Sequence, residues 1–571
     1  MAWFRRNSLG PLLVAMSLAA LLGFGVARGL HATDDMRSHL DLFSQVLYLV
    51  QNNYVEVPDN EKLIKGAIDG MLKTLDPHTV YLPMVRAQRM DEEFSGEYSG
   101  VGVQFDLRDG AIVVIAALEG GPSYRLGIQA GDRIVEIDGK PLAKNITNDD
   151  VYKMLRGPAG TTVAVTIERE GDAEPLHFSI ERAKIPLESV PYAYMIRPGV
   201  GYIRINRFAQ TTGAELEKAL SSLRQQGMKS LMLDLRGNYG GLLSQAVEVL
   251  DELVPQNKRV VYTRGRIASA NADYYSSERP KLADGPIVVL IDHGTASASE
   301  IVAGAIQDLD RGMVAGVNSF GKGLVQNQLR LGDGSKLLLT IAKYYTPSGR
   351  LIQRPYDKFA DRNEYSEDAN REDVPSDSVM ATRPKFKTVG GRSVYGGGGI
   401  YPDVVLKEGP VLTRPQIDML QKRVFFEFST HFVASHRDQK WTPQMLGRDF
   451  ALTEADWDHL HKIIENRKAA VSDSAWQADR PFMLQQVRAE IAAATVGRVE
   501  RYKILVEDDP QILAAFDLFP RASTLMSRVM DEGKERPSRN GASGSDATAG
   551  PRPDAPQTAA PEKAKPRSGK P

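Results

Sequence analysis

The chain has 571 residues, of which 42% are hydrophobic and 25% are charged, a composition typical of a globular protein with room for three or four domains. The formal net charge of −1 at pH 7 gives no indication of nucleic-acid binding. The lack of cysteine excludes disulfides, cysteine catalysis and a lipid anchor on cysteine.

Residues 1–32 are typical of an export signal. Arg5 and Arg6 precede an uncharged, largely apolar stretch from Asn7 to Ala27. This pattern predicts a signal peptide with its cleavage site at Ala27 or Ala32. The alternative is an uncleaved membrane anchor, since about 20 apolar residues span a bilayer. Both interpretations place the rest of the chain outside the cytoplasm, and we expect a periplasmic protein that is soluble or tethered to the inner membrane.

Residues 33–95 are expected to form a helical segment. Apolar residues recur at helical spacing from Asp34 to Tyr54, and a second helix is predicted over Glu61 to Leu75, where Asp76-Pro77 ends it. We interpret His78 as a turn residue rather than as a ligand.

Residues 96–183 carry short alternating strands separated by glycine turns. One glycine-bearing turn leads into an alternating strand, and Ala111 to Ala117 is a second strand. The run from Gly121 to Gly139 resembles the part of a PDZ domain in which a short helix, a turn and a strand follow one another. The resemblance implies a groove helix over Asp149 to Arg156 and a closing strand over Thr162 to Arg169.

A PDZ domain binds an extended peptide C-terminus as an added strand, and backbone N–H groups of a glycine loop hold its carboxylate. We assign that loop to Gly100, Val101, Gly102 and Val103. A glycine turn that binds no ligand is the alternative interpretation of these four residues.

Residues 184–406 are predicted to form a second, larger domain. After a linker, the strands Val200 to Ile205 and Ser230 to Leu235 flank a helix over Thr212 to Gln226, an arrangement that favours a parallel sheet. The turn Arg236-Gly-Asn-Tyr-Gly-Gly241 then leads into another helix, predicted over Leu242 to Leu253.

The stretch from Pro286 to Leu309 is predicted to be a buried strand, a turn and an amphipathic helix. Small residues occupy the turn, so a hydroxyl there can face solvent while helix N–H groups gather beside it, as an oxyanion requires. Ser297 lies in this turn and is the candidate nucleophile. Because Glu300 follows it by three positions, a serine that only caps the helix is the alternative.

Lys322 is the candidate base. The nine histidines lie in no context that suggests a triad, whereas Lys322 lies between two glycines after a predicted strand, Met313 to Val317. If strand geometry begins at the lysine, Lys322, Leu324 and Gln326 share one face, and the glutamine can hydrogen-bond the amine. The pKa of the lysine must then fall from about 10.4 toward about 7 to 8, which apolar burial can achieve. A solvated loop lysine is the alternative.

Two stretches, Thr295 to Glu300 and Phe320 to Gly323, together with Gln326 resemble the active-site signature of the carboxy-terminal processing proteases, the Ser-Lys peptidases with a PDZ domain. Lys322 follows Ser297 by 25 residues and Gln326 follows Lys322 by four, as in that family. The resemblance implies that Ser297 is the nucleophile, that Lys322 is the base and that Gln326 orients the lysine.

The same resemblance extends to other parts of the chain. Gly66 to Leu82 is similar to the N-terminal segment of the family, whereas Asp292 stands where the family usually has Asn. The resemblance implies an oxyanion hole made by the backbone N–H of Gly240 or Gly241 and by that of Ala298. It also implies a mixed α/β fold, in which a PDZ domain accompanies a ClpP/crotonase-like βα protease core, and a reaction that needs no metal, nucleotide or other cofactor.

Ser335 to Tyr345 is predicted to be a strand. Residues 356–382 are predicted to be a polar surface insertion or a flexible loop. The core is predicted to end near Leu406. Residues 407–533 are predicted to be a helical extension that caps the core, makes oligomer contacts or binds a partner, three roles that stay open. Its helical patterns are Arg414 to Ser435, Glu454 to Asn466, Arg480 to Arg498 and Pro510 to Val529. Residues 534–571 are predicted to be a disordered tail.

These observations predict a serine endopeptidase of the cell envelope, whose PDZ domain captures C-terminal tails of substrate proteins. The partners to consider are proteins with accessible tails, an activating or adaptor protein and a second copy of the chain, but no nucleic acid. Two alternatives stay open: a catalytically silent PDZ scaffold, and a crotonase-like enzyme that acts on acyl thioesters. A trypsin-like site is excluded, because Tyr239 occupies the place of the serine in Gly237-Asn-Tyr-Gly-Gly241.

Overall fold

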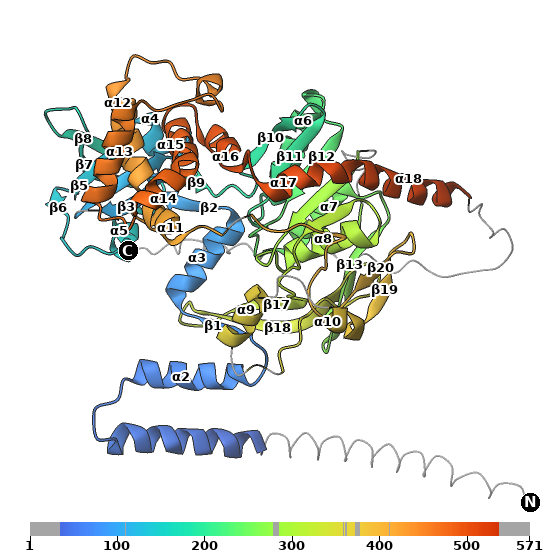
Figure 1. Ribbon diagram of the computed structural model, residues 1–571. Coiled ribbons are helices and arrows are strands. Elements are labelled where there is room, and N and C mark those ends of the chain that lie inside the picture. The colour runs from blue at the N-terminus through green and yellow to red at the C-terminus, as the bar shows by residue number, and fades with distance from the viewer. Residues whose placement is uncertain are drawn as a thin grey trace, which may run out of the picture.

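The structure is a computed structural model that describes residues 35–535, apart from residues 109, 278–284, 358, 360–361, 372–376 and 410. Four units follow one another along the chain: an N-terminal helical segment, a PDZ domain, a βα core and a C-terminal helical extension (Figure 1). The export signal predicted at 1–32 and nearly all of the tail predicted at 534–571 lie outside the described residues. Within the described ranges, no helix combines the length and the apolar character needed to cross a membrane.

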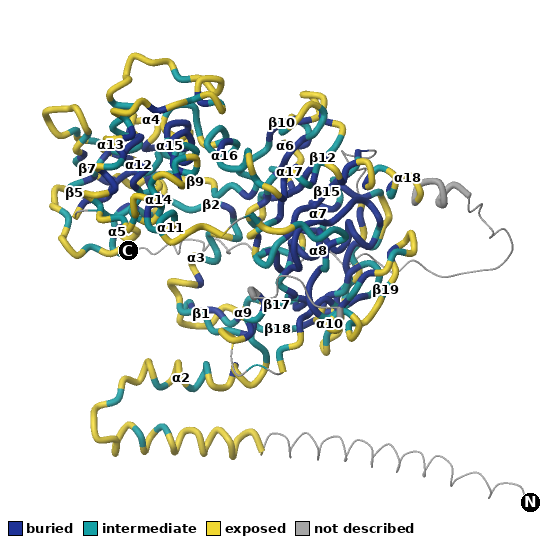
Figure 2. The backbone as a smooth tube through the Cα atoms, viewed as in Figure 1, coloured by how far each residue is buried: buried dark blue, intermediate teal, exposed yellow. Residues whose placement is uncertain are grey.

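The first two helices of the N-terminal segment extend away from the rest of the molecule, whereas β1 and α3 lie against it (Figures 1 and 2). It comprises a helix over residues 35–53, α2 (Asn60–Lys73), β1 (Val80–Leu82) and α3 (Met84–Ser95). Asp59 caps α2 by accepting a hydrogen bond from Lys62 N at 3.1 Å. Apolar side chains on the first two helices are exposed, among them Leu40, Phe43 and Ile64.

The PDZ domain is a sheet in the order β3-β4-β5-β7-β8, with β6 on β5, so that β3 is an edge strand. Its elements are β2 (Glu97–Gly100), β3 (Val103–Arg108), β4 (Ala111–Ala117), α4 (Pro122–Arg125), β5 (Arg133–Ile137), β6 (Lys140–Pro141), α5 (Asn148–Leu155), β7 (Thr162–Glu168), β8 (Leu176–Glu181) and β9 (Ala183–Pro186). Strands β2 and β9 pair where the chain enters and leaves the domain. The predicted groove helix is α5, whose Val151 and Leu155 join Ile134 and Ile167 in the domain core.

The βα core is built on a six-stranded sheet in the order β10-β11-β12-β15-β16-β21. Its strands are β10 (Tyr192–Arg197), β11 (Val200–Arg204), β12 (Ser230–Asp234), β15 (Ile287–Ile291), β16 (Met313–Gly316) and β21 (Val404–Val405), and its helices are α6 (Thr212–Gln225), α7 (Leu243–Leu253) and α8 (Ala298–Asp308). All neighbouring strands are parallel except β10 and β11. Alternate side chains such as Ile203, Leu233 and Val289 pack with apolar residues of α6, α7 and α8. Because β12 and β15 are parallel neighbours, the turns that follow them lie side by side.

A second, antiparallel sheet has the order β1-β18-β13-β14, with β17 on β18. Its strands after β1 are β13 (Arg259–Gly265), β14 (Ala272–Tyr275), β17 (Leu324–Arg330) and β18 (Lys336–Tyr345), and η1 (Ala268–Ala270) connects β13 to β14. The polar insertion predicted at 356–382 contains α9 (Arg362–Arg371) and α10 (Asp377–Thr382), and a hairpin of β19 (Lys385–Lys387) and β20 (Ser393–Tyr395) follows. The insertion is not only a surface feature, because Tyr365 is fully buried.

The C-terminal extension consists of short helices. They are α11 (Arg414–Gln421), α12 (Val424–Ser435), η2 (Pro443–Leu446), α13 (Glu454–Asn466), α14 (Asp473–Ala478), α15 (Arg480–Thr495), α16 (Arg498–Val506), α17 (Pro510–Ala515), η3 (Phe516–Leu518) and α18 (Phe519–Glu535). The continuous helix predicted over Arg414 to Ser435 is wrong, because Arg423 adopts a left-handed φ of 55° and separates α11 from α12. Helices α11 to α16 enclose an apolar cluster of their own, centred on Phe428, Leu460 and Val487.

Candidate active site

Ser297 lies where β15 turns into α8. It is the N-cap residue of α8 and has φ 55° and ψ −115°, a conformation that non-glycine residues adopt at a cost of about 1–3 kcal/mol. The turn packs tightly, since a Cβ on Gly294 would lie 2.8 Å from Gly237 Cα. Ser297 N–H donates to Glu300 Oε2 at 2.8 Å, so the capping relation that the sequence left open exists at this turn.

Glu300 is fully buried and ties the serine turn to the lysine loop. Its Oε1 accepts hydrogen bonds from Ser319 Oγ at 2.5 Å and Gly321 N at 2.8 Å, and its Oε2 accepts from Ser297 N at 2.8 Å and Lys322 N at 2.9 Å. Burial raises the pKa of Glu300 to about 7, although these four hydrogen bonds act in the opposite direction. One buried carboxylate thus fixes the backbone of both Ser297 and Lys322. The sequence indicated Glu300 only as a capping residue.

The lysine amine is held by Gln326. Lys322 Nζ donates to Gln326 Oε1 at 2.7 Å, which is the contact that the sequence led us to expect. Removal of the amine from water lowers the pKa of Lys322 to about 8, and the charge of Arg362 acts in the same direction. About one tenth of the amine is then neutral at pH 7. Among the described residues, Ser297 Oγ and Lys322 Nζ make no hydrogen bond with each other.

The strand argument behind the pairing of Lys322 with Gln326 is wrong in detail. Strand β17 begins at Leu324, two residues after the lysine, and its register against β18 shifts between Val325 and Gln326. A bulge of this kind re-aims a side chain. The bulge, rather than plain alternation, therefore sets the direction of Gln326.

Gln326 is in turn fixed by the N-terminal segment. Its Nε2 donates to the backbone oxygen of His78 at 2.5 Å. The carboxylate of Asp76 shapes this turn, because its Oδ1 accepts from His78 N at 2.8 Å and from Thr79 N at 2.9 Å. A second side chain from the core, Thr340, donates its hydroxyl to the same Asp76 oxygen at 3.2 Å. Asp76 thereby attaches the N-terminal segment to the lysine site.

The His78 ring is buried against two aromatic residues. It lies edge-on to Phe320, at a centroid distance of 6.4 Å, and to Tyr365 of the polar insertion, at 5.4 Å. Burial lowers the pKa of His78 to about 3, and the nearby charge of Lys322 adds to the effect. The ring is therefore neutral. The interpretation of His78 as a turn residue describes its backbone but misses its contact with Gln326, which no local pattern indicates because the two residues are 248 positions apart.

The glycine turn after β12 lies directly against Ser297. A Cβ on Gly240 would be 2.8 Å from Ser297 Cβ and 2.9 Å from Ala298 N, so only glycine fits there. Gly240 N–H donates to Asn238 Oδ1 at 2.9 Å. The N–H groups of Gly241 and Ala298 have no acceptor among the described residues. Of the two glycines predicted for an oxyanion hole, Gly241 is the one whose N–H is free.

Asp292 connects the two turns. Its Oδ1 accepts from Gly237 N at 2.8 Å and from Thr295 Oγ1 at 3.1 Å. An asparagine side chain offers the same acceptor oxygen. The departure from the usual Asn at this position therefore keeps the contact that joins the turn after β12 to the turn after β15.

The peptide loop predicted for the PDZ domain lies between β2, which ends at Gly100, and β3, which begins at Val103. Val101 O accepts from Ser123 N at 3.2 Å and from Ser123 Oγ at 2.7 Å, and Gly102 has a left-handed φ of 76°. The N–H groups of Val101 and Gly102 have no acceptor within the described part of the chain. Two free N–H groups thus stand at the start of the edge strand β3, as capture of a carboxylate requires.

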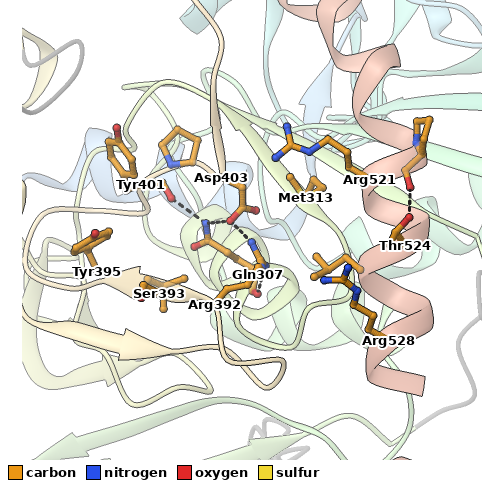
Figure 3. Close-up of a pocket in the computed structure, with 14 residues that line it drawn as sticks. Gln307, Met313, Arg392, Ser393, Tyr395, Tyr401, Asp403, Arg521, Thr524 and Arg528 are labelled. Carbon is orange, nitrogen blue, oxygen red and sulfur yellow. Dashed lines mark hydrogen bonds and ion pairs between the residues drawn. The ribbon is translucent and has the colours of Figure 1, made fainter. Parts of the chain in front are cut away.

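A cavity of about 600 Å³ lies apart from these residues, between α18, β20 and the segment before β21 (Figure 3). Arg392 projects into it and forms an ion pair with Asp403 at 2.5 Å, and Arg521, Thr524 and Arg528 line it from α18. None of the predicted site residues lines this cavity.

Three family models match the chain. Peptidase family S41 matches residues 199–356, the PDZ domain matches residues 113–169, and the activating protease CtpB N-terminal domain matches residues 25–84. The carboxy-terminal-processing protease of Bartonella bacilliformis is 39% identical over 315 residues, which cover 54% of this chain and 72% of that protein. The carboxy-terminal processing protease CtpB of Bacillus subtilis is 37% identical over 321 residues, which cover 55% of this chain and 66% of that protein.

Among solved structures, the photosystem II D1 C-terminal processing protease is 29% identical, with a TM-score of 0.32 over 63% of this chain and 85% of that one. A PDZ domain joined to an S41 peptidase core defines a serine-type peptidase of the PDZ-containing class. Within that class, the chain belongs to the carboxy-terminal processing protease family. The predicted fold class, family and type of enzyme are thereby confirmed.

Proposed function

We propose that the chain is an endopeptidase of the cell envelope in which Ser297 is the nucleophile, Lys322 the general base and Gln326 the residue that orients the lysine. The observation that carries the proposal is the buried carboxylate of Glu300, which binds the backbone N–H groups of both Ser297 and Lys322. A lysine of a solvated loop needs neither this anchor nor an amine whose pKa is lowered to about 8.

In the proposed reaction, Ser297 Oγ attacks the scissile carbonyl carbon while its proton passes to the neutral Lys322 Nζ. The oxyanion that forms accepts hydrogen bonds from Gly241 N–H and Ala298 N–H. The C–N bond then breaks, and the Lys322 ammonium returns the proton to the leaving amine. Water attacks the acyl ester and gives its proton to Lys322. The ester C–O bond then breaks, the Lys322 ammonium returns the proton to Ser297 Oγ, and the new C-terminal carboxylate is released. Because catalytic hydrogen bonds tighten when substrate binds, the contact between Ser297 and Lys322 is expected to form in the substrate complex.

The PDZ domain is proposed to capture the C-terminal tail of the substrate. A tail that adds to the edge strand β3 brings its carboxylate to the free N–H groups of Val101 and Gly102. Phe105 of β3 and Tyr152 of α5 are in edge-to-face contact, with ring centroids 5.4 Å apart, so aromatic rings lie where a tail added to β3 would run beside α5. These aromatic rings favour tails that end in an apolar residue.

The envelope location is proposed from residues 1–32, because their pattern is that of an export signal or anchor. Self-association or an activating partner is proposed from the exposed apolar side chains of the N-terminal helices, among them Leu40, Phe43, Val46 and Ile64. Exposed apolar patches of this kind mark interaction surfaces.

Cleavage of an unfolded protein such as casein by the purified chain tests the proposed mechanism. We expect Ser297→Ala and Lys322→Ala each to lower kcat by at least about 10³-fold, with an unchanged circular dichroism spectrum. Lys229→Ala, which removes an exposed lysine just before β12, at the end of that strand opposite the glycine turn, is the control and should cleave as the parent does. Cleavage by Ser297→Ala at the rate of the parent would refute the proposal.

Tail capture needs a separate comparison. One unfolded substrate is offered with and without its last few residues. The proposal predicts slower cleavage of the shortened substrate through a higher KM. Equal rates would remove the case for capture by the PDZ domain.

A further inference from the structure

The C-terminal extension forms part of the core. Helices α17 and α18 and the turn between them place Ile512, Leu518 and Phe519 against Met232 and Leu290, on the face of the core sheet opposite α6, α7 and α8 (Figure 1). The matched peptidase model ends at residue 356. None of the matched models therefore assigns a role to this extension.

The start of α17 also binds the arginine that begins the glycine turn. Arg236 Nη1 donates to Asp509 Oδ2 at 2.9 Å and to Gln511 Oε1 at 2.8 Å. The other guanidinium nitrogens of Arg236 donate to Asp234, at the end of β12, at 2.7 to 3.2 Å. Arg204 forms an ion pair with Asp234 at 3.2 Å, so two guanidinium groups meet two carboxylates. Burial opposes ionisation of Asp234, but Arg236 and Arg204 outweigh it and lower its pKa.

Arg236 leads directly into the residues that face Ser297. It is followed by Gly237, with a left-handed φ of 68°, and by Asn238, whose side chain accepts from Gly240 N–H at 2.9 Å. Gly241 follows Gly240, and its backbone N–H is the one that has no acceptor among the described residues. Arg236 holds the beginning of this short turn and Phe208 holds its end, because Phe208 N donates to Gly240 O at 3.0 Å and Leu242 N donates to Phe208 O at 2.8 Å. A shift of Arg236 is therefore expected to displace the Gly241 N–H between them.

We propose that Asp509 and Gln511 are positioning residues of the oxyanion turn, which fix the Gly241 N–H beside Ser297 by holding the guanidinium of Arg236. This inference rests on the proposed function, because that function gives Gly241 its role. The oxyanion exists only during the reaction, so correct positioning of its donor stabilises the transition state and not the bound substrate.

Asp509→Asn separates the effect of Asp509 on Arg236 from its structural role as the cap of α17. The asparagine keeps an oxygen in the place of Oδ1, which caps α17 by accepting from Gln511 N at 2.9 Å and Ile512 N at 3.1 Å. It removes the charge that Arg236 binds. We expect kcat to fall about tenfold while KM stays within about twofold, because a displaced donor costs less than the 10²–10³-fold loss of a deleted one.

Glu507→Gln is the matched control. It breaks an ion pair with Arg488, at 2.7 Å, inside the same extension and two residues from Asp509, but Glu507 does not bind Arg236. Its kcat should equal that of the parent. An equal fall of kcat in both variants would mean that only the stability of the extension matters, and would overturn the proposal.

Amide hydrogen exchange over residues 236–241 gives a readout that does not depend on cleavage. We expect exchange in this turn to be about tenfold faster in Asp509→Asn than in the parent or in Glu507→Gln. Unchanged exchange would overturn the proposal, and so would faster exchange with an unchanged kcat. Lack of Ser297-dependent cleavage by the parent would contradict the proposed function instead, and the exchange experiment would still decide whether Asp509 positions the turn.

Discussion

The two sides of Ser297 are held by different parts of the chain. On the lysine side, Glu300 holds the backbone of Ser297, three residues away, and that of Lys322, 22 residues away, while Gln326 holds the amine of Lys322 from four residues away. On the oxyanion side, Arg236 is held by Asp509, which is 273 residues away. Both sides therefore draw on segments outside the active-site motifs. The lysine side is supported by His78 of the N-terminal segment through Gln326, and the oxyanion side by Asp509 of the C-terminal extension through Arg236.

Among the variants that test this comparison, Glu300→Gln has the largest expected effect, because its carboxylate holds the backbone of both Ser297 and Lys322. Four donors converge on the carboxylate, so the amide group of glutamine must face at least one of them with its own hydrogens. We expect kcat/KM to fall about 100-fold, because a buried donor is left without a partner and both reactive residues shift.

Kinetics on a tail-bearing peptide, with melting curves to show that the chain is folded, measure this effect. Glu181→Gln, at an exposed position of β8, is the control. If Glu300→Gln retains kcat/KM within about threefold of the parent, catalysis does not need the carboxylate that holds Ser297 and Lys322, and the account of the lysine side is wrong.

A smaller effect, with a defined direction in pH, is expected from Gln326→Glu. A carboxylate at the position that accepts from Lys322 Nζ at 2.7 Å favours the charged amine and raises its pKa above about 8. Since only the neutral lysine acts as a base, the midpoint of the pH–kcat/KM profile should move up by about one unit. Gln328→Glu, on the same strand but beside Lys336 at 3.0 Å, should leave the midpoint unchanged.

An equal midpoint in Gln326→Glu and the parent would contradict this assignment. It would mean that Lys322 does not titrate in the reaction. A loss of activity without a change of midpoint would leave Gln326 with a packing role only.

The smallest effect concerns the strain at the residue between the two sides. Ser297 has φ 55° and ψ −115°, which glycine adopts readily and alanine does not. We expect Ser297→Gly to exceed Ser297→Ala in free energy of unfolding by about 1 kcal/mol, although both are inactive. Chemical denaturation of the two variants measures the difference. Equal stability of the two would show that the serine turn carries no strain.

Much of the fold follows from periodicity in the sequence. The strand predicted over Ala111 to Ala117 has those bounds as β4, and the helix predicted from Leu242 begins one residue later as α7. These elements have strong apolar patterns over their whole length. The helix predicted over Arg414 to Ser435 is broken, because Arg423 adopts a left-handed backbone conformation. Arginine rarely adopts this conformation, so the sequence does not indicate the break.

The sequence likewise predicts some residues of the active site and misses others. The turn and loop context and the resemblance to the family's active-site signature predict Ser297, Lys322 and Gln326, and the structure brings Lys322 and Gln326 into contact. The contact of Gln326 with His78 spans 248 residues, and that of Arg236 with Asp509 spans 273. Such contacts depend on how whole elements pack, so no local pattern in the sequence indicates them.

The pH dependence of kcat/KM is the most direct test of the central claim that a neutral Lys322 activates Ser297. Because burial lowers the pKa of Lys322 to about 8, the amine is protonated below that pH and neutral above it. The account predicts that kcat/KM rises with pH, levels off beyond a midpoint of about 8, and loses this rise in Lys322→Ala. A rise with a midpoint near about 8 that persists in Lys322→Ala would contradict it.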